Sequence, residues 1–176
     1  MKTEGLRWGV KTRLEKREGN INLCRTPEER LKFLEDNKPY EVKEIEGNLL
    51  LDEGMDLLFS LATGQGGTAF AEATAQLGVG NSSTAAARTQ VDLQGASSDW
   101  QGMEANFPTA PAENDATDGR SVKFKASFAD AGSDFAWEEW SIRNDATDDK
   151  NLNRKVESLG SKSGGTWTLE VEISLS

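Results

Sequence analysis

Two segments in the last third of the chain alternate apolar and polar side chains strictly, and this pattern constrains the fold most. From Trp167 to Leu175 every second residue is apolar, and the same holds from Val122 to Phe128. A period of two places all apolar side chains of a strand on one face, so each segment reads as a half-buried strand. Strands of this kind separated by Gly-, Asn- and Ser-rich turns are typical of antiparallel sheets. We expect a mainly β chain, an antiparallel, jelly-roll-like β-sandwich with one or two short helices. If the two segments pair, Lys123 and Lys125 face Glu170 and Glu172.

A third strand is expected between these two, with an irregularity at its centre. On a regular strand Phe135 and Trp137 point to one face, whereas Trp140 and Ile142 point to the other. Either a β-bulge lies at Glu138–Glu139 or the strand is covered on both faces. The bulge is favoured, because two adjacent buried glutamates without partners are costly.

Two helices are expected in the first half of the chain. Thr26-Pro27-Glu28-Glu29 is a helix N-terminus with a Thr cap and Pro at the first position, and this helix ends before Pro39. A second helix begins near Asp52, the expected N-cap, and ends at Gly64. Its expected buried face is Leu51, Met55, Leu58 and Ala62. Residues 88–119 are expected to form a long excursion, pinned by Val91, Leu93, Trp100, Met103 and Phe107.

Charge is distributed unevenly along the chain. The whole chain has a net charge of -10, but residues 1–25 carry seven basic and three acidic side chains. A basic tip on an acidic body predicts an arm that docks on another molecule, with a solvated start that has no partner as the alternative. We therefore predict an extended N-terminal arm with a short helix over residues 1–46 and a β-sandwich body over residues 47–176. The expected partner-binding residues of the arm are Leu6, Arg7, Trp8, Val10, Lys11, Arg13, Leu14 and Arg17.

Composition argues against several classes of function. The chain has no histidine and a single cysteine, Cys24, which removes the commonest catalytic bases, Cys-His nucleophiles and multi-Cys zinc sites. We therefore expect the chain to have no enzymatic activity and to bind neither a cofactor nor a metal ion. The acidic balance and the absence of a long apolar run argue against direct nucleic-acid binding and membrane insertion, and no secretory signal is expected.

Two weaker motifs contain groups that could carry chemistry. Glu138 and Glu139 are adjacent acids, but on a regular strand they point to opposite faces and make a poor acid/base pair. The sequence Asn-Asp-Ala-Thr-Asp occurs at 114–118 and again at 144–148. Asx turns explain these repeats better than Ca²⁺ loops do, because the spacing of oxygen ligands is wrong for an EF-hand.

Several short segments, taken in order, resemble a known family. They are Gly47-Asn48-Leu49-Leu50-Leu51-Asp52-Glu53-Gly54-Met55, Leu77-Gly78-Val79-Gly80-Asn81-Ser82-Ser83-Thr84-Ala85, Thr89-Gln90-Val91-Asp92-Leu93-Gln94-Gly95, Phe135-Ala136-Trp137-Glu138-Glu139-Trp140, Asn151-Leu152-Asn153-Arg154-Lys155-Val156, and residues 159–169. The series is similar to small virion structural proteins of tailed double-stranded DNA bacteriophages, of the capsid decoration or cement type.

The resemblance implies a protein of the virion that sits on the outer surface of the phage head and is made in the host cytoplasm. Its implied partners are the major capsid protein of the same phage and further copies of itself, as a homodimer or homotrimer. Two alternatives stay open: a structural protein of the tail, collar or baseplate, and a module that binds host-surface glycans through Trp100 and Trp140.

Overall fold

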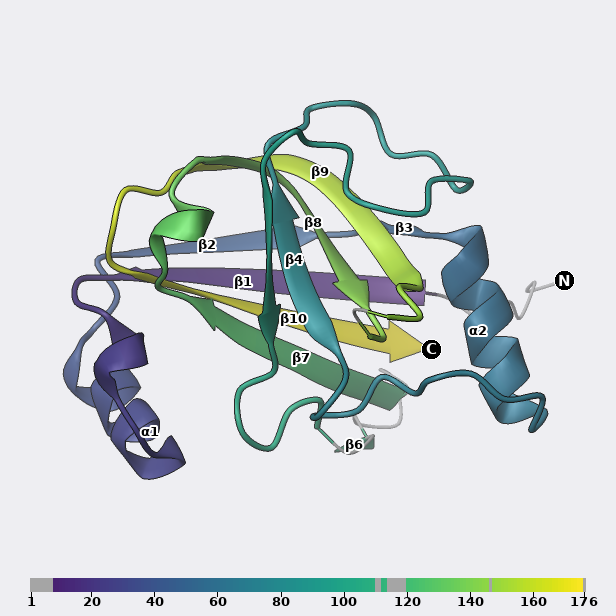
Figure 1. The fold of residues 1–176 in the computed structure, drawn as a ribbon, viewed down its shortest axis with the longest axis horizontal. Helices are drawn as coiled ribbons and strands as arrows, with labels where there is room; N and C mark the ends of the chain where they lie inside the picture. Colours follow the sequence, from purple (N-terminus) through teal and green to yellow (C-terminus); the bar gives the residue numbers. More distant parts are fainter. Residues whose placement is uncertain (1–7, 110–111, 114–119, 146, 176) are drawn as a thin grey trace, which may run out of the picture.

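The computed structural model describes residues 8–109, 112–113, 120–145 and 147–175. These residues form two antiparallel five-stranded sheets packed face to face (Figure 1). Sheet A has the strand order β2 (Glu41–Glu46), β1 (Trp8–Arg17), β10 (Thr166–Leu175), β7 (Arg120–Phe128), β6 (Ala112–Glu113). Sheet B has the order β3 (Leu49–Leu50), β9 (Asn151–Ser161), β8 (Ala136–Arg143), β4 (Gln76–Gly80), β5 (Ser98–Gly102). The predicted mainly β, antiparallel sandwich is confirmed.

The predicted N-terminal arm is wrong for residues 8–46. Strand β1 pairs with β10 along its whole length, from Trp8 opposite Leu175 to Arg17 opposite Thr166, and with β2 on its other side. Its side chains Val10 and Leu14 lie in the core. The alternation from Trp8 to Leu14 is therefore that of an internal strand, and residues 8–46 and 47–175 share one sandwich instead of forming an arm and a body.

The core lies between the sheets and is rich in aromatic side chains. Trp137 contacts Phe128 and Trp167 edge to face, with ring centroids 4.9 and 4.8 Å apart. The pairing of β8 with β9 shifts register between Trp137 and Glu139, which confirms the predicted bulge. Because of this shift, Trp137 and Trp140 both reach the core.

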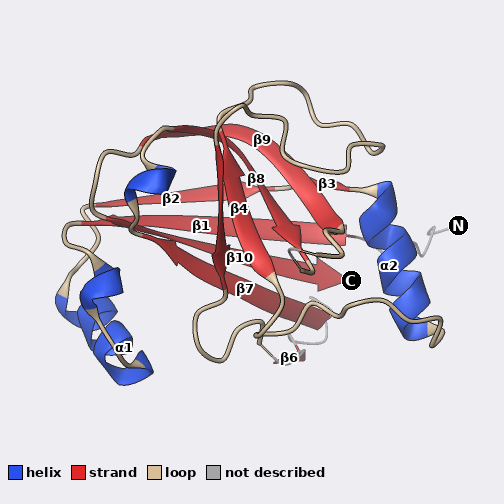
Figure 2. Cartoon of the chain, in the orientation of Figure 1, coloured by secondary structure: helices blue, strands red, loops and turns tan. Residues whose placement is uncertain are grey.

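Two α-helices flank the sandwich at opposite ends of its long axis (Figure 2). Helix α1 (Pro27–Asp36) begins after the predicted N-cap Thr26, which also forms a capping box with Glu29. Helix α2 (Asp52–Ala62) has Leu51 at its N-cap, one residue before the expected Asp52. Two 3-10 turns, η1 (Ile21–Leu23) and η2 (Ala131–Ser133), complete the elements. No helix in the described ranges is long and apolar enough to cross a membrane.

The buried face of α2 differs from the predicted one. Gly54 and Leu57 are buried, whereas Leu58 and Ala62 are exposed. A Cβ on Gly54 would lie 2.5 Å from the carbonyl oxygen of Leu152, so the helix backbone rests directly on β9. The closest approach thus occurs at a residue without a side chain, which an apolar periodicity does not reveal.

Candidate functional site

A long ordered loop over residues 81–97 joins β4 to β5, and we call it the β4–β5 loop. Figure 1 shows it as the teal excursion that rises above sheet B beside β9. Its first seven residues, 81–87, are small and uncharged, and most of them are exposed. Leu93 is buried and pins the loop as predicted, but Val91, also predicted as an anchor, is 60% exposed.

A fully buried ion pair lies beneath this loop. Glu139 of β8 and Arg154 of β9 both have no exposed side-chain surface, and Arg154 Nε donates to Glu139 Oε2 at 2.6 Å. Strands β8 and β9 are neighbours, so both side chains stand on the outer face of sheet B, away from the aromatic core. Sheet B is thus covered on both sides at this point, by the core and by the loop.

The ion pair is linked to the loop by backbone hydrogen bonds. Glu139 accepts from the backbone N–H groups of Gln94 and Gly95, at 3.0 and 2.7 Å to Oε1, and from that of Ser82 at 3.3 Å. Arg154 donates to the carbonyl oxygen of Thr84 at 3.0 Å. It also donates to the Gln90 side chain at 2.9 Å. The two charges therefore hold both limbs of the loop.

Further contacts fix the tip of the loop. The buried Asn151 donates to the Val91 carbonyl oxygen at 2.9 Å. Asp52 accepts from Arg88 Nε at 2.9 Å, and its backbone N–H donates to the Arg88 carbonyl oxygen at the same distance. A loop tied at this many points is held in one conformation, and a preorganised loop loses less entropy in binding than a free one does.

The sequence pattern did not single out Glu139 and Arg154 as a pair. The bulge was predicted because adjacent buried glutamates without partners are costly, and Glu139 is in fact buried with a partner. One signal was nevertheless present. Four of the segments that carry the family resemblance supply most of the loop, the strand before it and both charges. They are residues 77–85, 89–95, 135–140 and 151–156.

The eight predicted arm residues do not form one exposed surface. Leu6 and Arg7 lie outside the described residues. Trp8 is half-buried and donates to Asn48 Oδ1 at 2.9 Å, and Val10 and Leu14 are core residues. Arg17 is buried, donating to the carbonyl oxygen of Asn37 at 2.9 Å and to Glu15.

Lys11 and Arg13, the other two, belong to a regular array of charges on the outer face of sheet A. Cross-strand register places acids on β2, bases on β1, acids on β10 and bases on β7. We call this array the charge ladder: Glu44, Arg13, Glu170 and Lys125 in one row, and Glu46, Lys11, Glu172 and Lys123 in the next. Arg13 lies 2.9 Å from Glu44, and Lys125 lies 3.3 Å from Glu170. The predicted facing of Lys123 and Lys125 with Glu170 and Glu172 is confirmed.

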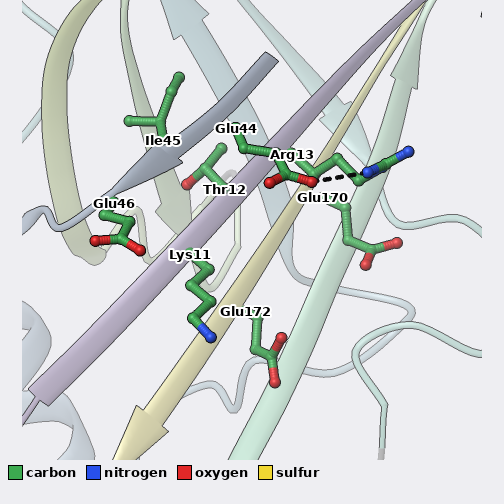
Figure 3. A pocket seen from close by; sticks show the side chains of 8 residues that line it. All are labelled: Lys11, Thr12, Arg13, Glu44, Ile45, Glu46, Glu170 and Glu172. Atoms are coloured by element: carbon green, nitrogen blue, oxygen red, sulfur yellow. Dashed lines mark hydrogen bonds and ion pairs between the residues drawn. The ribbon is translucent and has the colours of Figure 1, made fainter. Parts of the chain in front are cut away.

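Figure 3 shows a trough between the two rows of the charge ladder. It is lined by Lys11, Thr12, Arg13, Glu44, Ile45, Glu46, Glu170 and Glu172. The trough walls carry both signs of charge, so the basic residues assigned to the arm are neutralised within the sheet instead of forming a basic tip.

The two tryptophans proposed for glycan binding do not form a pair. Trp140 is fully buried in the core. The ring of Trp100 packs on Gly78, where a Cβ would lie 2.4 Å from the ring, and the Arg143 guanidinium lies 4.2 Å from the ring centroid. Trp100 and Trp140 therefore do not make an exposed aromatic platform.

The two other motifs, the adjacent acids Glu138 and Glu139 and the Asn-Asp-Ala-Thr-Asp repeats, do not form a catalytic or metal site within the described residues. Glu138 is partly exposed and accepts from Ser158, whereas Glu139 is buried, so the two do not form an acid/base pair. The 114–118 repeat lies outside the described residues. In the second copy, backbone N–H groups of Thr147 and Asp148 donate to Asp145 and lower the pKa of its carboxyl, as in an Asx turn. The described residues hold no group of three His, Cys, Asp or Glu side chains placed to bind a metal.

Comparison of the chain with protein-family models, with curated proteins and with solved structures finds no match.

Proposed function

We propose that the chain is a virion structural protein of a tailed double-stranded DNA bacteriophage, a decoration or cement protein on the outer surface of the head. The observation that carries this proposal is the convergence of the family-like segments on one preorganised loop and its buried ion pair. In this proposal the β4–β5 loop docks on the major capsid protein, and the sandwich is a rigid support without enzymatic activity.

The chemistry of the loop suits contact with a protein surface. Its small, uncharged residues 81–87 allow the backbone to approach a partner closely, and Val91 offers an exposed apolar contact. A net charge of -10 on the chain disfavours binding to DNA phosphates, which agrees with a place on the outside of the shell.

Co-sedimentation with purified capsid shells tests the docking role. Ala85→Glu and Val91→Glu alter exposed loop positions and leave the buried anchors intact, so the fold should persist while binding falls by about tenfold or more. Ala62→Glu adds the same charge at the far end of α2 and serves as the matched control. If all three variants bind shells as tightly as the wild type does, the loop is not part of the interface.

A structural protein of the tail, collar or baseplate is the second candidate. The same rigid loop suits either position, because both demand a protein surface as the partner. Copy number separates the two, since a head decoration protein is present in far more copies than a tail protein.

A further inference from the structure

The outer face of sheet A carries a pattern of charge that complements itself. Across the four strands β2, β1, β10 and β7, the charge ladder reads negative, positive, negative, positive in both rows. Reversing the order of these four columns puts a positive column at each position where a negative column stood, and the reverse. A two-fold axis that runs parallel to the strands, between β1 and β10, reverses this order and keeps each row in place.

We propose that this face is the interface of a symmetric dimer, with a second copy of the chain as its occupant. The rotation places β7 of one copy over β2 of the other, and β10 of one over β1 of the other. Each positive column then lies over a negative column, so Lys125 faces Glu44 of the second copy and Arg13 faces Glu170. Sheets packed face to face keep their strands within about 30° of parallel, as this axis requires.

The side chains of the ladder are available for such contacts. Glu44 and Arg13 keep 75% and 45% of their side-chain surface exposed, and Lys125 and Glu170 keep 22% and 25%. Their in-plane ion pairs are exposed and contribute little to stability. A second layer of opposite charge adds pairs without breaking these.

The same rotation accounts for two exposed apolar side chains at one end of the face. Helix α1 stands over β7, because Arg30 Nε donates to Glu104 at 2.9 Å and Leu31 shares a small pocket with Lys125. Leu31 is 57% exposed, and Val42 of β2 is 42% exposed on the outer face. Since β2 of the second copy lies opposite β7, its Val42 comes toward Leu31.

The size of the face sets the expected strength. Strands β1 and β10 have ten residues, β7 has nine and β2 has six, so the face covers about 550 Å² on each copy. Standard interfaces bury about 800 Å² on each partner, so the dimer should be weak and in rapid exchange.

Sedimentation velocity over a range from micromolar to millimolar protein, at about 0.15 M salt, tests the proposal. Wild type should dimerise with increasing concentration. Glu44→Lys should weaken the dimer by about tenfold, because two positive side chains then meet where Lys125 of the second copy had faced a carboxylate. This substitution also lowers the magnitude of the net charge, which by itself would favour association, so a loss reports the local contact. Asp56→Lys, at an exposed position of α2 on the sheet B side, makes the same change in net charge and should leave the dimer intact.

The double variant E44K/K125E provides the decisive test. Within one copy these two positions are three strand spacings apart, about 14 Å, so they do not pair with each other. Across the two-fold axis they do, and the double variant should recover the dimer to within about threefold of wild type. Circular dichroism first checks that each variant is folded. A monomeric wild type at all concentrations, a dimer insensitive to Glu44→Lys, or a folded double variant that stays monomeric would each overturn the proposal.

Discussion

Among single residues, Glu139 holds the β4–β5 loop most directly, since three loop N–H groups and Arg154 converge on one buried carboxylate. Glu139→Gln removes the charge and leaves Arg154 buried without its counter-ion. We expect the free energy of unfolding to fall by about 3–5 kcal/mol and hydrogen exchange to accelerate at the N–H groups of Gln94 and Gly95. The neighbouring Glu138→Gln is the matched control, with a change of about 0.5 kcal/mol or less. Equal effects at the two positions would contradict the assigned role of the ion pair.

A second single-residue prediction concerns pH. Burial acts to raise the pKa of Glu104, but hydrogen bonds from Arg30 and Ser127 outweigh it and hold the pKa below its ordinary value of 4.5. Because the folded-state pKa is the lower one, this carboxylate stabilises the fold above about pH 4.5, and the stabilisation is lost as pH falls through the folded-state pKa.

Glu104→Gln should therefore lower the free energy of unfolding by about 2 kcal/mol at pH 7, and the difference from wild type should shrink as pH falls below 4.5. Urea unfolding across this pH range measures it, with exposed Glu35→Gln as the control. A difference that stays constant with pH would show that the carboxylate charge is not what stabilises α1 on the sandwich.

At the scale of elements, β1 decides whether the chain folds. It lies between β2 and β10 and brings Val10 and Leu14 into the core. Deleting residues 1–17 leaves β10 without its neighbour on one side, so we expect the truncated chain to lose the cooperative thermal transition of the full chain. A folded, cooperatively melting truncation would instead revive the idea of a detachable arm.

The last strand makes a matching prediction about the core. Trp167 is buried and its ring centroid lies 4.8 Å from that of Trp137. Trp167→Ala should lower the free energy of unfolding by about 3–5 kcal/mol, whereas Leu175→Ala, at an exposed strand end, should cost much less. Chemical denaturation measures both, and equal costs would contradict the inward orientation of Trp167.

Elements with a strong local signal were predictable from the sequence. The alternation of 167–175, the bulge at Glu138–Glu139 and the Thr26 cap each depend on neighbouring residues, and each is confirmed. The position of β1 was not predictable, because its basic outer side chains resemble a docking tip until the acids of β2 and β10 lie beside them. Likewise, Glu139 looked costly to bury because its partner is 15 residues further along the chain.

At the scale of the whole molecule, two surfaces on opposite faces have separate proposed binding roles. We propose the β4–β5 loop on sheet B for docking on the shell and the charge ladder on sheet A for contact with a second copy. In a dimer joined through the outer face of sheet A, the two loops lie on opposite sides, so only one loop of a dimer can face a given capsid surface.

The central proposal, a structural protein of a phage head, is tested most directly by quantitative mass spectrometry of purified phage particles. If the chain decorates the head, its copy number should be of the same order as that of the major capsid protein. A copy number of only a few per particle would assign it to the tail, collar or baseplate, and its absence from purified particles would contradict a virion role altogether.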